Sequence, residues 1–251
     1  MILESSRNPR WLSNTWLLAE ERGGCGVIVD SGGPVEPLLG LIRREEIRIT
    51  HILNTHHHPD HILENGRLRR ELNAPVVAHV LDAARIPDCD LTVEDGQVLE
   101  SGILRITCLH IPGHTAGQLA FLAGEAGGGE EALCFTGDTL FRGSVGGTCG
   151  PGHTTFADLR HSILEVLMAL PPATRLLPGH MEPSTVAAEW ERNPFIRAWR
   201  GLDPPAETAC TALGRPATLL LRARDYDGGT KAWVRFRADG REDVVPGSRV
   251  S

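Results

Sequence analysis

The stretch from Asn54 to Gly66, NTHHHPDHILENG, decides how this sequence is interpreted. Four of the chain's eleven histidines lie at positions 56–61, beside a proline and an aspartate. Neutral imidazole and carboxylate groups are ligands that suit zinc, and also iron or manganese. Ligand types of this kind at this spacing are more typical of a metal site than of a solvated polar loop.

The stretch contains two pairs of candidate ligands. His56 and His58 are two residues apart, so both can point to one side of a loop that follows a strand. Asp60 and His61 come after a proline that stiffens the loop, and they can face a different point. His57 is left over and is expected to point elsewhere.

One loop cannot complete a coordination sphere, so further ligands are expected elsewhere in the chain. Three candidates are His114 in IPGHTAGQ, Asp138 in FTGDTLF and His180 in LPGHMEP. Each follows an apolar run typical of a strand, and each sits beside a glycine that permits close backbone approach. Functional side chains at strand ends are a recurrent arrangement in layered α/β folds.

Strand and helix patterns alternate along most of the chain, which favours an α/β architecture with helices covering sheet faces. Thr154 or Thr155 is expected to cap the most regular of the helices. The pattern predicts a hairpin at 14–33, helices at 35–46, 61–73 and 154–172, and strands at 48–55, 74–79, 102–114, 132–141 and 174–180.

The character of the sequence changes after Asp203. DPPAE at 203–207 is typical of a linker, and three short strands with hairpin turns are expected from Pro216 onward. Residues 208–251 carry 8 Lys/Arg against 5 Asp/Glu, a small local excess of positive charge. We therefore predict a main domain at 1–203 and a small β-rich appendage at 204–251.

Composition narrows the class of protein. A chain of 251 residues is long enough for one large core. Its formal net charge of −7 does not suggest a surface that binds nucleic acid along a whole face. No apolar run has the length of a membrane span or of a signal-peptide core. Six cysteines without a CxxC pair indicate free thiols, so a cytoplasmic location is expected.

The order H-x-H-x-D-H, then a lone His, Asp and His after successive strands, resembles the signature of the metallo-β-lactamase superfamily. The resemblance covers about residues 14–200. It implies an αββα sandwich with metals in a groove at one edge of two packed sheets. It also implies two ligand sets and a bridge: His56, His58 and His114 for one metal, Asp60, His61 and His180 for the second, and Asp138 between them.

The resemblance implies a hydrolase that uses two divalent cations, zinc before iron or manganese. Cations about 3.5–4 Å apart share a water molecule and lower its pKa toward neutrality, which gives a bridging hydroxide as nucleophile. We therefore expect hydrolysis of a thioester or ester of a small molecule. Asp60 and Asp138 are the candidate catalytic carboxylates, whereas Asp30 is expected to support the site without binding metal.

Within the superfamily the sequence is most similar to the glyoxalase II-like branch, the hydroxyacylglutathione hydrolases. The motifs THHHPDH, PGHTAGQ, FTGDTLF, LPGH and NPFIR carry this resemblance. The chain departs from the branch in the loop from Gly143 to His153, which lacks the basic residue that helps to hold glutathione. The helical glutathione-binding extension is also absent, so the reaction class is expected to transfer better than the substrate.

Three alternatives remain open within this signature. An iron-dependent persulfide dioxygenase would use the region of His56, His58 and Asp138 together with His114. An RNA-processing nuclease would use the basic tail, but the small charge excess there argues against nucleic acid as a partner. A lactonase is a variation within the hydrolase class. The oligomeric state is left open.

Overall fold

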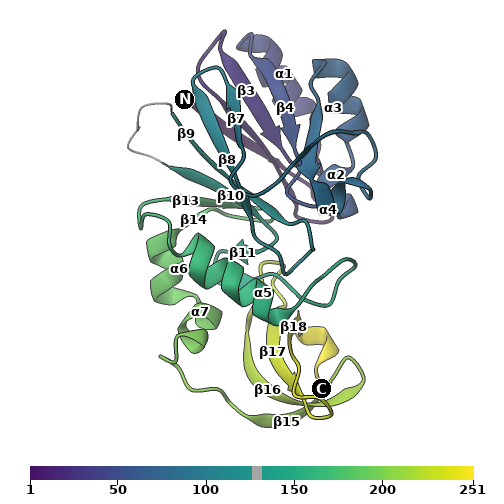
Figure 1. Cartoon of the computed structure of the whole chain (residues 1–251), viewed down its shortest axis with the longest axis vertical. Coiled ribbons are helices and arrows are strands. Elements are labelled where there is room, and N and C mark those ends of the chain that lie inside the picture. The colour runs from purple at the N-terminus through teal and green to yellow at the C-terminus, as the bar shows by residue number, and fades with distance from the viewer. Residues whose placement is uncertain (126–131) are drawn as a thin grey trace.

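The computed structural model describes residues 1–125 and 132–251 and contains two six-stranded sheets packed face to face (Figure 1). In the first sheet the strands from β1 to β3 are antiparallel and those from β3 to β6 are parallel. In spatial order its strands are β1 (Ile2–Arg7), β2 (Asn14–Ala19), β3 (Cys25–Val29), β4 (Arg48–Leu53), β5 (Val76–His79) and β6 (Cys89–Val93).

The second sheet is antiparallel except where β10 pairs with β13. Its strands in spatial order are β14 (Ser184–Thr185), β13 (Arg175–Pro178), β10 (Leu133–Gly137), β9 (Leu119–Glu125), β8 (Leu104–His110) and β7 (Val98–Ser101). A short hairpin follows β10 and consists of β11 (Leu140–Phe141) and β12 (Ser144–Val145).

Helices cover the outer faces of both sheets, as Figure 1 shows for α1 and α3 on one side and α5 and α6 on the other. The first group comprises α1 (Glu36–Arg44), α2 (Pro59–Ile62), α3 (Asn65–Leu72) and α4 (Val80–Ala83). The second comprises α5 (Phe156–His161), the π-helical turn η1 (Ser162–Leu167), α6 (Val186–Arg192) and α7 (Pro194–Trp199). The predicted αββα sandwich is confirmed.

The alternation of side chains along β2 explains why the layers stack in this way. Trp16 and Leu18 belong to the apolar cluster between the sheets, whereas Leu17 and Ala19 pack under α1 and α3. Because successive side chains of a strand point to opposite faces, a strand that is apolar throughout can be buried on both faces. The sheets therefore form the middle of the molecule.

Two helical patterns differ in detail from the prediction. The single helix predicted at 61–73 is two helices, α2 and α3. The first begins at Pro59, so Asp60 and His61 both lie in a short helix. The helix predicted at 154–172 begins at its capping residue, Thr155, which forms a capping box with Asp158. It ends as a π-helical turn.

The C-terminal sheet has four strands where three were predicted. They are β15 (Thr208–Ala212), β16 (Arg215–Arg224), β17 (Thr230–Phe236) and β18 (Glu242–Pro246), followed by the 3₁₀ turn η2 (Gly247–Arg249). The strand missed was β15, whose sequence TACTA has small side chains and no clear apolar alternation. Thr211 and Ser251 exchange two backbone hydrogen bonds, which ties the chain end to the first strand.

This C-terminal sheet packs against the second group of helices. Trp233 stacks on Phe156 at 5.6 Å between ring centroids and meets the edge of Trp199 at 6.4 Å. Val244 is fully buried in the same apolar cluster. The boundary at 203/204 stays a prediction, but the appendage shares a core with the main domain. Among the described residues, no helix is both long and apolar enough to cross a membrane.

Candidate metal centre

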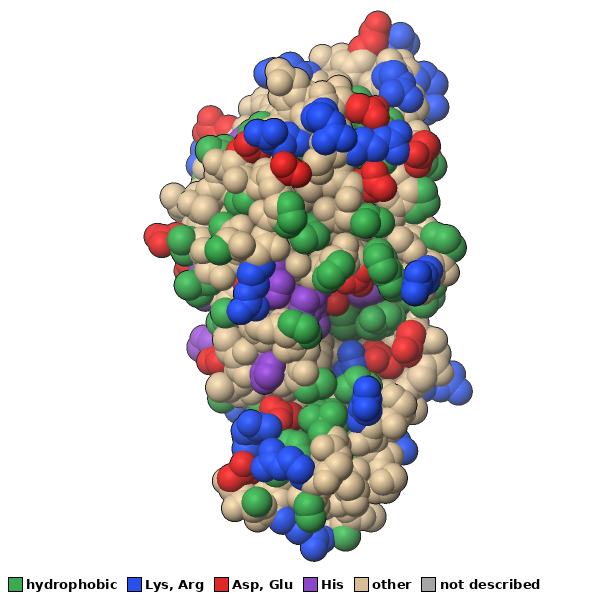
Figure 2. All heavy atoms as spheres, turned by 90° about the vertical axis from the view of Figure 1, so that its right-hand side faces the viewer, with side chains coloured by type: hydrophobic (Ala, Val, Ile, Leu, Met, Phe, Trp, Pro, Cys, Tyr) green, Lys and Arg blue, Asp and Glu red, His purple; other side chains and the backbone are tan. Residues whose placement is uncertain are grey.

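All seven predicted ligands lie at one edge of the two sheets. His56 and His58 follow β4, Asp60 and His61 lie in α2, and the other three follow β8, β10 and β13 of the second sheet. Figure 2 shows histidine and acidic side chains together at the bottom of a hollow, with hydrophobic side chains around it. The structure therefore brings together residues that are as far apart in sequence as positions 56 and 180.

Three histidines form the first group. The Nδ1 atom of His58 lies 3.0 Å from Nε2 of His56 and 3.0 Å from Nε2 of His114. Nitrogen ligands held tetrahedrally at about 2.0–2.1 Å from a zinc ion would lie about 3.3 Å apart. The three ring nitrogens therefore converge at a spacing close to that of ligands around one cation.

The second group contains one carboxylate and two histidines. The Oδ2 atom of Asp60 lies 3.6 Å from Nε2 of His61 and 3.5 Å from Nε2 of His180. Both histidines are buried, whereas Asp60 is partly exposed. The three donor atoms lie within 4.8 Å of one another, so they fit a second cation.

Asp138 lies between the two groups. Its Oδ2 atom is 3.6 Å from Nε2 of His114 in the first group and 3.3 Å from Nε2 of His180 in the second. Its Oδ1 atom is 3.4 Å from Nε2 of His61. Among the described residues, neither Oδ1 nor that nitrogen has a hydrogen-bond partner, although both are buried. Unpaired buried polar atoms are costly, and a shared cation would satisfy both.

Hydrogen bonds on the far side of the rings orient two of the histidines. Nδ1 of His61 donates to Oδ2 of Asp30 at 2.8 Å, and Nδ1 of His114 donates to the carbonyl of Gly147 at 3.0 Å. Asp30 is in turn fixed by the backbone N–H and the hydroxyl of Thr55. Each ring is thereby held with its Nε2 atom facing the centre. Asp30 supports the site from behind, as expected.

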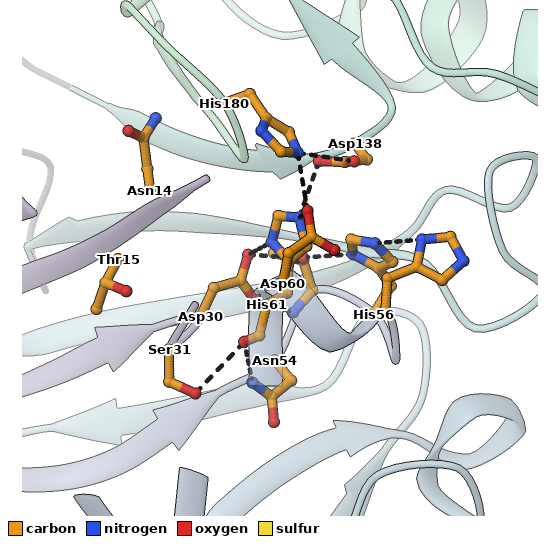
Figure 3. Close-up of polar contacts among 12 residues, drawn as sticks. Asn14, Thr15, Asp30, Ser31, Asn54, His56, Asp60, His61, Asp138 and His180 are labelled. Carbon is orange, nitrogen blue, oxygen red and sulfur yellow. Dashed lines mark hydrogen bonds and ion pairs between the residues drawn. The ribbon is translucent and has the colours of Figure 1, made fainter. Parts of the chain in front are cut away.

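The backbone beside two ligands is held by buried polar side chains (Figure 3). The side chains of Ser31 and Asn54 both donate to the carbonyl of His61. Asn14 donates to the carbonyls of Pro178 and Met181, on either side of His180. These amides and the hydroxyl fix the ligand-bearing loops without contacting the centre.

Two glycines beside ligands cannot be replaced by larger residues. Gly137 precedes Asp138 with φ of +47°, and a Cβ there would lie 2.3 Å from the side-chain nitrogen of Gln118. A Cβ on Gly179 would lie 2.3 Å from the Asp138 carboxylate. The prediction that glycine permits close approach here is confirmed.

Without a cation, the buried histidines and carboxylates of the centre strongly shift one another's pKa values. Burial lowers the pKa of His61, but the carboxylates of Asp138 and Asp30 outweigh it and raise that pKa to about 10. Burial lowers the pKa of His114 to about 3 against the pull of Asp138. Burial would raise the pKa of Asp138, yet His180 and His61 hold it well below its usual range. His61 would therefore have to lose a proton before its Nε2 atom could hold a cation.

His57 lies outside the ligand groups, as predicted. Its Nδ1 donates to Asp82 at 2.8 Å, and Asp82 also accepts from Thr115 at 2.8 Å and from the N–H of Gly117 at 3.0 Å. The burial of Asp82 would raise its pKa, but these donors lower it. One carboxylate thus joins the loop of His57 to the loop after β8.

Sequence reasoning missed the contribution of the C-terminal sheet to this centre. The ring of Tyr226 lies on the imidazole of His180, with 4.3 Å between centroids and 16° between planes. Lys231 pairs with Asp225 at 3.1 Å nearby. The sequence offered one indication of this contribution. Tyr226 and Lys231 are the only tyrosine and the only lysine in the chain.

Comparisons with known proteins agree with this geometry. The model of the metallo-beta-lactamase superfamily matches residues 8–180. A hydroxyacylglutathione hydrolase of Rhodospirillum rubrum is 35% identical over 77% of this chain and 72% of its own length. The crystal structure of ETHE1 from Myxococcus xanthus has a TM-score of 0.68 at 28% identity and covers 82% of this chain and 93% of that one.

A third comparison concerns metal. TTHA1623 in a di-iron-bound form is 33% identical with a TM-score of 0.63, covering 78% of this chain and all of that one. The superfamily model spans more than half of the chain, and its range includes all seven residues of the site. This chain belongs to the metallo-beta-lactamase superfamily.

Proposed function

We propose that the protein is a dinuclear metal-dependent hydrolase of small thioesters or esters. The observation that carries this proposal is the position of Asp138, whose two oxygens lie 3.3–3.6 Å from histidines of both ligand groups. A carboxylate so placed fits the bridge between two cations. The likeness to hydroxyacylglutathione hydrolases supports the choice of an acyl compound as substrate.

Two cations held by these residues would supply a hydroxide nucleophile at neutral pH and polarise the carbonyl to be attacked. Asp138 would set their spacing, and Asp30 would keep His61 in the tautomer that binds. The donor set of imidazoles and carboxylates suits zinc, which we propose first. Iron or manganese fits the same donors, and the di-iron form of TTHA1623 makes iron the nearest competitor.

The chain's own residues argue against glutathione as the preferred leaving group. Glutathione carries two carboxylates, so a dedicated site needs fixed cationic groups. The loop from Gly143 to His153 contains no lysine or arginine, and Arg142 just before it is exposed. Lys231 lies over the rings of Phe141 and Tyr226, but Asp225 already compensates its charge. We therefore propose a smaller or differently charged thiol or alcohol.

A substrate panel tests this proposal. Metal-loaded protein should hydrolyse at least one small thioester or ester with kcat/KM above the value for S-lactoylglutathione. Protein stripped with a chelator and returned to the same buffer serves as the control and should be inactive until metal is restored. If S-lactoylglutathione exceeds every other substrate by about tenfold or more, equal to about 1.4 kcal/mol of transition-state stabilisation, a glutathione site exists after all.

A second candidate function is persulfide oxidation. The likeness to ETHE1, a persulfide dioxygenase, favours it, since the same histidines and Asp138 can hold iron. Iron-loaded protein supplied with glutathione persulfide in an oxygen electrode decides between the two. Oxygen uptake faster than hydrolysis of any ester or thioester would make this second function the correct one.

Nucleic acid is a poorer fit for the C-terminal sheet. Three of its arginines are paired with acids: Arg215 with Asp239, Arg235 with Glu242 and Arg241 with Asp243. A phosphate backbone would have to compete with each of these pairs.

The state of the cysteines bears on the location of the protein. All six are free thiols. Free thiols are typical of a reducing compartment, so we propose that the protein is cytoplasmic.

A further inference from the structure

We propose that Tyr226 is a positioning residue of the metal centre, whose phenol donates a hydrogen bond to an oxygen of the bound acyl substrate. The C-terminal sheet would then complete the active site of the main domain. This inference rests on the proposed hydrolase function and deepens it, because it assigns a substrate contact to a residue outside the superfamily match at 8–180.

The composition of the chain makes the position unusual. Of the 25 lysines and arginines in the sequence, only one is a lysine. The sequence also contains a single tyrosine. Both lie in the hairpin formed by β16 and β17, Tyr226 in the turn and Lys231 near the start of β17. Lys231 is buried, with an exposed fraction of 7%, although lysine is among the residues least often buried.

The ring of Tyr226 covers one face of a proposed ligand. It lies almost parallel to His180 at 4.3 Å, and Phe141 packs against it at 4.7 Å. The Nε2 atom of His180 faces Asp60 and Asp138 at 3.5 and 3.3 Å. The phenol ring therefore lies against a histidine whose Nε2 atom is directed at both acids of the centre.

The hydroxyl of Tyr226 is available for a ligand. No hydrogen bond to it is formed within residues 1–125 and 132–251. The ring lies on His180, whose Nε2 atom is 3.3 Å from Asp138, so the phenol belongs to the immediate surroundings of the centre. A phenol is a donor at neutral pH.

A buried ion pair fixes the hairpin that carries this ring. The carboxylate of Asp225 accepts from the hydroxyl of Ser144 at 2.8 Å and from the N–H of Tyr226 at 2.9 Å, and it pairs with Lys231 at 3.1 Å. Ser144 lies in β12, six residues after Asp138. These contacts attach the hairpin to the segment that follows the proposed bridging residue.

A purely structural role of Tyr226 would depend on its ring and not on its hydroxyl. The substitution Tyr226→Phe separates the two roles, because phenylalanine keeps the contacts with His180 and Phe141. A structural role predicts no change in this variant. A positioning role predicts a loss of substrate affinity or turnover while the metal content and the melting temperature stay as in the wild type.

The experiment compares metal-loaded wild type with Tyr226→Phe by three readouts. Metal content should be equal in the two proteins. The Kd of acetohydroxamate, an unreactive ligand with two oxygens for a dinuclear centre, should rise about tenfold by calorimetry, equal to about 1.4 kcal/mol. With the best substrate of the panel, kcat/KM should fall about 10- to 100-fold.

The control is Trp233→Phe, which changes an aromatic residue of the same sheet that packs on Phe156 and not on His180. It should leave the Kd of acetohydroxamate unchanged. Equal acetohydroxamate affinity in Tyr226→Phe and wild type would overturn the proposal, and so would loss of metal from Tyr226→Phe. If the wild type hydrolyses no acyl compound, the proposed function fails, but the acetohydroxamate comparison still decides the role of Tyr226.

Discussion

Replacing Asp138 by alanine is expected to lower kcat/KM at least about 10³-fold, equal to about 4 kcal/mol of transition-state stabilisation. Asp138 contacts histidines of both groups at 3.3–3.6 Å, so its loss removes the element that fixes the spacing of two cations. Metal should be lost together with activity. Kinetics on the best substrate and elemental analysis of the same preparation measure both effects.

The control for this variant is Asp158→Ala, which removes a carboxylate from the capping box of α5. It should lower the free energy of unfolding by about 0.3–1 kcal/mol, as for an acidic side chain in the first turn of a helix, and leave the metal content unchanged. Circular dichroism should show that Asp138→Ala keeps its secondary structure, because the apolar clusters between and outside the sheets are untouched. An Asp138→Ala protein with full metal and turnover would mean that this residue is not the bridge.

Replacing Lys231 by alanine is expected to lower the free energy of unfolding by about 3–5 kcal/mol, because it leaves a buried carboxylate without its cation. The side chains of Lys231 and Asp225 are each 8% exposed. Urea denaturation of the metal-loaded protein measures the change. The double variant Lys231→Met/Asp225→Asn removes both charges and should be more stable than the single variant.

Arg235→Ala is the matched control, since it breaks an ion pair of the same sheet in which the arginine is 44% exposed. Its cost should be below about 1 kcal/mol, as for other exposed pairs. A loss in Lys231→Ala no larger than that of Arg235→Ala would show that the buried pair contributes little to the attachment of the C-terminal sheet.

The seven ligand candidates were predictable from short local motifs, whereas their division into two groups came from the resemblance to the superfamily. Each ligand follows an apolar run, and His114, Asp138 and His180 each follow a glycine directly. In each case the strand ends at the same edge of the sheets, and the glycine lets the residue that follows it approach the other ligands closely. The seven residues could therefore be assembled from the sequence before their distances were known.

The role of the C-terminal sheet was not predictable in the same way. The contact of Tyr226 with His180 joins positions 46 residues apart, and no local pattern indicates it. Periodicity likewise gave no sign of β15, because its sequence TACTA contains no large apolar residue. The π-helical turn after His161 was missed for a related reason, since the apolar spacing of 156–170 fits an ordinary helix equally well.

The most direct test of a dinuclear centre is the metal content at saturation. Protein purified without added metal, then loaded with zinc and freed of excess, should contain two equivalents per chain by elemental analysis. His61→Ala and His180→Ala should each reduce this value to about one, because His56, His58 and His114 remain as a complete group. A saturated value of one equivalent in the wild type, unchanged in both variants, would contradict the account.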